Sequence, residues 1–131
     1  MKTLTMTVLL NSAMLFGAAA QAASPAQILA QLQSEAGGAS AARGKQLYHG
    51  KFTGGKAESC ATCHTPDPRD EGRHARTNKP IEPLSPVSNS ERFTDMEKVE
   101  KWFKRNCNDV LGRACTAQEK ADFAAYVLSV K

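Results

Sequence analysis

The sequence of 131 residues has few aromatic side chains and no dense run of basic residues. Without basic runs interleaved with aromatics, its modest formal charge of +4 gives no reason to expect a nucleic-acid partner. It shows no internal repeat, no low-complexity tract and no sign of a second domain. A chain this short buries only about 60–65% of its unfolded surface. With so few aromatics, its core needs another source of apolar contact.

The first 22 residues have the three parts of a secretory signal peptide. Lys2 gives a positive start, positions 6–16 are mostly apolar, and Ala20-Gln21-Ala22 is a small-x-small cleavage site. The alternative is a membrane anchor, but this run is too short to cross about 30 Å of hydrocarbon. We therefore expect residues 1–22 to be removed on export to the periplasm, an oxidising compartment, leaving residues 23–131 as one domain.

Two of the four cysteines belong to a motif that carries chemistry. Cys60-Ala61-Thr62-Cys63-His64 has the Cys-x-x-Cys-His spacing of c-type haem attachment. Each thiol adds to one vinyl group of the porphyrin, and two intervening residues let both sulfurs reach one haem edge. His64 then binds the iron as proximal axial ligand. We expect one covalent haem c, which would also supply the missing apolar centre.

Two other interpretations of this motif are weaker. A thioredoxin-like redox pair needs a βαβ pattern, and no strand pattern surrounds Cys60. A zinc site would need suitably spaced further ligands, and Cys107 and Cys115 lack that spacing with this pair.

Capping signals predict three or four helices and one long irregular stretch. Ser24 and Ser40 begin two helices, which end near Gly37-Gly38 and Gly50. Residues 65–89 contain five prolines and no period, which fits a loop wrapped around a cofactor.

Capping boxes at Thr94–Glu97 and Thr116–Glu119 predict two further helices, separated by a loop over residues 107–115. The expected architecture is all-α, with the helices packed around one haem.

The sixth iron ligand decides the function, because Met or His gives a low-spin electron carrier and a weak ligand leaves iron open to small molecules. Met96 is the leading conventional candidate, although an apolar helix position equally fits core packing. His49, close to the haem motif, and His74 and Lys79, in the long loop, are further candidates.

The long loop is also expected to support the proximal ligand. His64 should donate its second ring N–H to a carbonyl that fixes its orientation, and residues 80–84 are a candidate source. Ile81, Leu84 and Val87 would then line the haem face, unless they are ordinary loop-packing residues.

Four further segments resemble the sphaeroides haem protein group of class I cytochromes c. They are residues 78–89 (NKPIEPLSPVSN), 92–95 (RFTD), 99–103 (VEKWF) and 107–112 (CNDVLG). The resemblance extends from about Ala42 to Val130. It implies a small class I cytochrome c fold, a Cys107–Cys115 disulfide and Asn89 as a sixth ligand, although Asn78 lies in the same loop.

The resemblance also implies a function. Members of this group are high-spin, and they bind oxygen or nitric oxide when the asparagine leaves reduced iron. Their redox partner is a dihaem cytochrome c linked to a membrane cytochrome b. A carboxamide oxygen is a hard, weak-field donor, so reduction should loosen Asn89. On composition alone, Ser88-Asn89-Ser90 would be a turn or a cap.

Three functional classes therefore remain open. The first is an electron carrier that also binds diatomic ligands at a site opened by Asn89. The second is a conventional low-spin His/Met shuttle that uses Met96. The third is a small haem reductase or oxidase component, which is less favoured because no general acid or second metal site is evident.

Cations flank the haem motif and the long loop. They are Lys51, Lys56, Arg73, Arg76 and Lys79. They are either a docking rim that speeds encounter with an acidic partner or an ordinary solvated surface.

Overall fold

The computed structural model describes residues 22–131, so the predicted signal peptide, residues 1–22, lies outside them apart from Ala22. Two helices open the described chain. α1 (Pro25–Ala36) has the predicted capping box, in which the Ser24 hydroxyl accepts from the Gln27 N–H, and it ends at Gly37 with φ 76°. α2 (Ala41–His49) begins after Ser40, as predicted.

The Cys-x-x-Cys-His motif forms a separate one-turn helix, α3 (Cys60–His64). The all-α class is confirmed, but the described residues contain five helices rather than three or four, because this turn is helical in its own right. No helix in this part of the chain has the length and apolar character needed to cross a membrane.

The long loop is not wholly irregular. It contains a small antiparallel hairpin of β1 (Gly72–Arg73) and β2 (Pro80–Ile81), in which Gly72 pairs with Ile81. Asn78, with φ 55°, helps the chain to turn between the strands. Two-residue strands are too short to leave an alternating pattern, so they could not be predicted from the sequence.

α4 (Met96–Leu111) begins one residue later and ends five residues later than predicted. Asp95, not Thr94, caps its start by accepting from the Lys98 N–H, while the Thr94 hydroxyl donates to the Glu91 carbonyl. The prediction of a loop over residues 107–115 is wrong for residues 107–111, which are helical. Cys107 lies inside the helix, which ends at Gly112 with φ 71°.

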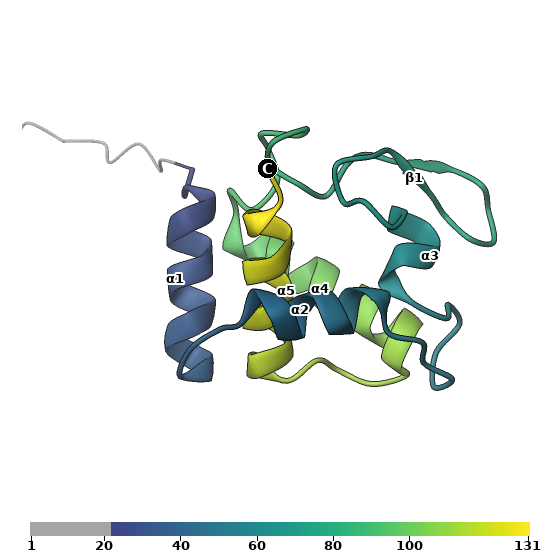
Figure 1. The fold of residues 1–131 in the computed structure, drawn as a ribbon, viewed down its shortest axis with the longest axis horizontal. Helices are drawn as coiled ribbons and strands as arrows, with labels where there is room; N and C mark the ends of the chain where they lie inside the picture. The colour runs from purple at the N-terminus through teal and green to yellow at the C-terminus, as the bar shows by residue number, and fades with distance from the viewer. Residues whose placement is uncertain (1–21) are drawn as a thin grey trace, which may run out of the picture.

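α5 (Ala117–Ser129) has the predicted Thr116–Glu119 capping box and is the central helix. α1 runs beside it and α2 crosses it (Figure 1). At that crossing Gly44 lies against the Asp122 carbonyl and the Tyr126 side chain, so the two backbones meet without a side chain between them. α3 and the hairpin extend from this helical body (Figure 1).

Candidate functional site

The haem motif occupies a helix that is too short to be stable on its own, so contacts at both ends support it. At its start the Ser59 hydroxyl accepts from the Thr62 N–H, and the Thr62 hydroxyl accepts from the Ser59 N–H. At its end the hydroxyl of Tyr48, from α2, donates to the carbonyls of His64 and Thr65. The capping box therefore closes the first turn of the motif, and Tyr48 fixes its other end to the helical body.

Cys60 and Cys63 are free thiols that lie three residues apart on this one helix, and both are half-buried. Burial raises the pKa of Cys60 to about 11, and the neighbouring Cys63 adds to that effect. Two uncommitted thiols on one turn, followed by a histidine, match the donor set for covalent haem attachment. These residues fit haem c.

Burial lowers the pKa of His64 to about 4, with a further contribution from the nearby guanidinium of Arg92. The imidazole is therefore neutral at physiological pH, which is the form that binds iron. His64 is thus suited to the role of proximal ligand that the motif predicts.

The hairpin packs directly against the motif. A Cβ at Gly72 would collide with the Cys63 carbonyl and approach the His64 Cα to 3.0 Å. The Ala75 N–H donates to Cys63 Sγ at 3.4 Å. The hairpin therefore covers the Cys63 end of the motif.

The segment from Pro80 to Phe93 is tied down by backbone hydrogen bonds. The N–H groups of Leu84 and the fully buried Ser85 both donate to the Pro68 carbonyl. Arg92 donates to the carbonyls of Glu82 and Pro83 at 2.9 and 2.8 Å.

Two predictions for this segment concerned a carbonyl partner for the His64 ring and side chains that line the haem face. Among the described residues the His64 ring makes no hydrogen bond to it, and the carbonyls of Glu82 and Pro83 accept from Arg92 instead. Leu84 packs against the core, whereas the side chain of Val87 is exposed.

Asn89 lies beside an open pocket of about 430 Å³, together with Glu82, Pro83, Ser88 and Glu91. Its Nδ2 donates to Glu82 Oε2 at 3.1 Å, and its Oδ1 accepts from the Glu91 N–H at 3.2 Å. Asn78, the other asparagine of the loop, is instead a turn residue of the hairpin and is exposed.

The other candidate ligands have structural roles. Met96 is the first residue of α4 and packs against the core. His49 Nε2 lies 3.2 Å from the Tyr126 hydroxyl. His74 Nδ1 accepts two backbone N–H groups within its own turn, and Lys79 is exposed.

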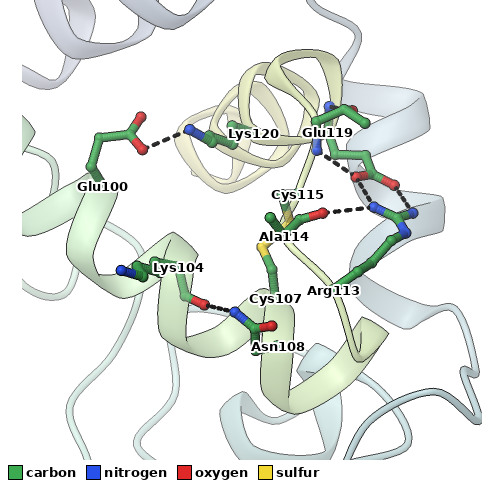
Figure 2. Close-up of a disulfide and its surroundings, with 10 residues drawn as sticks. Glu100, Lys104, Cys107, Asn108, Arg113, Ala114, Cys115, Glu119 and Lys120 are labelled. Atoms are coloured by element: carbon green, nitrogen blue, oxygen red, sulfur yellow. Dashed lines mark hydrogen bonds and ion pairs between the residues drawn. A yellow bond between two sulfur atoms is a disulfide. The ribbon is translucent and has the colours of Figure 1, made fainter.

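Cys107 and Cys115 form a disulfide, as the family resemblance implied, with their Cα atoms 5.5 Å apart (Figure 2). The bond joins the last turns of α4 to the residue before the cap of α5. Nearby, Lys120 of α5 pairs with Glu100 of α4 at 2.6 Å (Figure 2).

Sequence reasoning missed two residues of this site, Tyr48 and Arg92. Tyr48 was visible only as a residue of the second helix, and Arg92 only as part of a resembling segment. Neither has a motif, because each acts on backbone carbonyls that the fold brings to it from elsewhere in the chain.

A one-turn helix with two free thiols and a neutral histidine, set in a small all-α fold, defines a c-type cytochrome. A family model described as a domain of unknown function (DUF1924) matches residues 34–127. Cytochrome c-type protein SHP of Cereibacter sphaeroides is 48% identical over 123 residues, which cover 91% of this chain and 95% of that protein.

Solved structures agree. That of oxidised SHP, described as an oxygen-binding cytochrome c, has a TM-score of 0.78 at 46% identity and covers 82% of this chain and 98% of its own. The structure of oxidised cytochrome c'' from Methylophilus methylotrophus has a TM-score of 0.72 at 36% identity, and the match covers 82% of this chain and 94% of that one. The chain belongs to the family of small c-type cytochromes that includes SHP and cytochrome c''. Its membership implies haem c as cofactor.

Proposed function

We propose that this protein is an exported monohaem cytochrome that transfers electrons and binds oxygen or nitric oxide on the haem face opposite His64. The cytochrome class follows from the family. The ligand-binding role is supported by the contrast between Asn89, at an open pocket, and Met96, whose side chain is partly buried against the core. It is also supported by the 46% identity to a protein described as oxygen-binding.

The haem supplies a one-electron couple and an iron position for a small diatomic molecule. His64 holds the proximal side as a neutral imidazole. Asn89 would supply the second iron ligand through its carboxamide oxygen. An amide nitrogen has no free lone pair, whereas Asn89 Oδ1 has two and uses one to accept from the Glu91 N–H, so the oxygen is the atom that would bind iron. Because this oxygen is a weak donor, it would give way to a diatomic ligand at lower cost than a thioether would.

The compartment and partner are part of the same proposal. The signal-peptide pattern of residues 1–22 supports a periplasmic location. The family resemblance supports a dihaem cytochrome c or a membrane cytochrome b as redox partner. The exposed cations of the hairpin beside Cys63 support a partner with an acidic docking surface.

The visible spectrum of the ferric protein and of two variants tests the ligand. Wild type is expected to be high-spin. Asn89→Ala should leave the ferrous spectrum unchanged and open ferric iron to added anions. Met96→Ala should alter packing but not the spin state.

The opposite pattern would make the chain a conventional His/Met shuttle. In that case wild type is low-spin, Met96→Ala makes it high-spin, and Asn89→Ala changes nothing. Steady-state turnover of oxygen or nitric oxide with an electron donor would instead place it among the reductases or oxidases.

A further inference from the structure

The structure shows an unusual support beneath the haem motif. Tyr48 is 0% exposed, and its hydroxyl lies 3.0 Å from the His64 carbonyl and 2.7 Å from the Thr65 carbonyl. Carbonyls at the end of a helix have no partner within the helix. Tyr48 satisfies them and so ties the backbone of the axial ligand to α2.

The residue after the ligand has a strained backbone. Thr65 has φ 63° and ψ 166°, a region that residues with a side chain rarely adopt. Its hydroxyl donates to the Asp67 carbonyl at 2.7 Å and accepts from the Asp67 N–H at 3.2 Å. Such strain persists only where surrounding contacts impose it, and the Tyr48 hydroxyl is one of those contacts.

Tyr48 itself has no room to move. Its ring lies 5.0 Å from that of His49, 5.3 Å from that of Tyr126 and 6.0 Å from that of Phe123. A phenolic hydroxyl keeps its proton at neutral pH, so the Tyr48 hydroxyl is a donor to these two carbonyls. A fixed donor on a rigid helix is well placed to hold a backbone segment.

We propose that Tyr48 is a positioning residue for the proximal ligand: by holding the carbonyls of His64 and Thr65, it fixes the imidazole under the iron. A further consequence is that the bond that His64 would make to iron breaks less often when a strong ligand binds on the other side. The role toward His64 rests on the haem motif. Only the consequence for a ligand on the opposite face rests on the proposed function.

Tyr48→Phe tests this, with Tyr126→Phe as a matched control. Tyr126 belongs to the same aromatic cluster, but its hydroxyl contacts His49 Nε2 rather than the motif. The first measurement is the set of hyperfine-shifted NMR resonances of the His64 ring in the ferric holoprotein. The second is the five-coordinate fraction after the ferrous protein is exposed to nitric oxide, since that ligand weakens the bond opposite to it.

Tyr48→Phe should shift the His64 resonances and raise the five-coordinate fraction several-fold, whereas Tyr126→Phe should leave both as in wild type. If both variants lower the melting temperature but neither moves the His64 resonances, Tyr48 only fills the core and the proposal is overturned. If wild type takes up no nitric oxide, the ligand-binding function fails, and the NMR comparison still decides the role of Tyr48.

If Tyr48→Phe folds too poorly to be measured, Thr65→Gly can be added to it. Glycine adopts a positive φ without strain, so Thr65→Gly removes the need for a contact that imposes that conformation. The double variant Tyr48→Phe/Thr65→Gly should therefore recover holoprotein that Tyr48→Phe alone loses. If adding Thr65→Gly recovers no holoprotein, the proposal is contradicted.

Discussion

Asp122 is a buried carboxylate that is held by donors from two helices and the turn before one of them. It is 4% exposed and accepts from the Ser40 N–H at 2.6 Å, from Arg43 at 2.6 and 2.8 Å, and from Gln118 at 3.0 Å. Burial alone would raise the pKa of Asp122, but these donors outweigh it and hold the pKa below the ordinary value. The ionised form is thus stabilised in the folded protein.

This depressed pKa predicts acid sensitivity. The stabilisation is fully present above the unfolded-state pKa of 3.8 and is lost as the pH falls through the folded-state value. Asp122→Asn should cost about 1–2 kcal/mol at neutral pH, since Arg43 is half-exposed and screened. Urea unfolding should show the two proteins converging in stability below about pH 4. A pH-independent gap would contradict the prediction.

Gly72 permits the close approach of the hairpin to the haem motif. Gly72→Ala places a methyl group against the Cys63 carbonyl and the His64 Cα, so the hairpin or the motif must shift. We expect a loss of about 1–3 kcal/mol in the free energy of unfolding and a lower yield of holoprotein. The control is Glu71→Ala, an exposed neighbour that should match wild type. If Gly72→Ala gives as much holoprotein as wild type, the hairpin can move away from the motif at little cost.

At the scale of elements, the Cys107–Cys115 disulfide fixes the end of α4 to the start of α5. It closes a nine-residue loop, for which chain entropy gives roughly 2.5 kcal/mol. Replacing both cysteines with serine should lower the free energy of urea unfolding by about that amount. Two thiols that react with an alkylating reagent in the unreduced, unfolded protein would show that the bond is absent in solution.

The structure divides the predicted cationic rim into two groups. Lys51 pairs with Glu58 at 3.1 Å and Lys56 lies 4.0 Å from Asp109. Arg73, Arg76 and Lys79 are exposed on the hairpin that covers Cys63. The hairpin group is therefore the better candidate for guiding an acidic partner.

Charge reversal compares the two groups. Arg76→Glu should slow reduction by ascorbate, an anionic donor, several-fold at low ionic strength, and the difference should vanish in high salt. Lys51→Glu should have a smaller effect, because the charge of Lys51 is already paired with that of Glu58. Equal effects of the two reversals would favour a uniformly solvated surface.

At the scale of the whole molecule, one measurement of the mass of the mature protein tests both signal-peptide cleavage and haem attachment. In a host with working cytochrome maturation, the product should begin at Ala23 and carry one haem. The Ala23 N–H donates to the Thr94 carbonyl at 2.9 Å, and the new terminal ammonium can keep that bond. Cys63→Ala and His64→Ala should abolish normal holoprotein. A mature chain without a haem increment would refute covalent attachment.

The local features of this protein could be predicted from short stretches of the chain. The haem motif depends on the spacing of five neighbouring residues, and caps such as Ser24 and Thr116 depend on residues three positions away. Both are written in consecutive positions, so the all-α class and the attachment site could be predicted. The start of α4 was missed by one residue because Thr94 and Asp95 are both good caps.

The contacts that hold this motif depend on how the whole chain folds. Tyr48 and Gly72 reach His64 or Cys63 from 16 and 9 positions away, and Asp122 binds Ser40 across 82. Whether Asn89 lies beside a pocket and Met96 against the core likewise depends on which side chains the fold brings next to them. Such contacts leave no period or spacing in the chain, because a hydrogen bond or a close approach depends on position in space and not on separation in sequence.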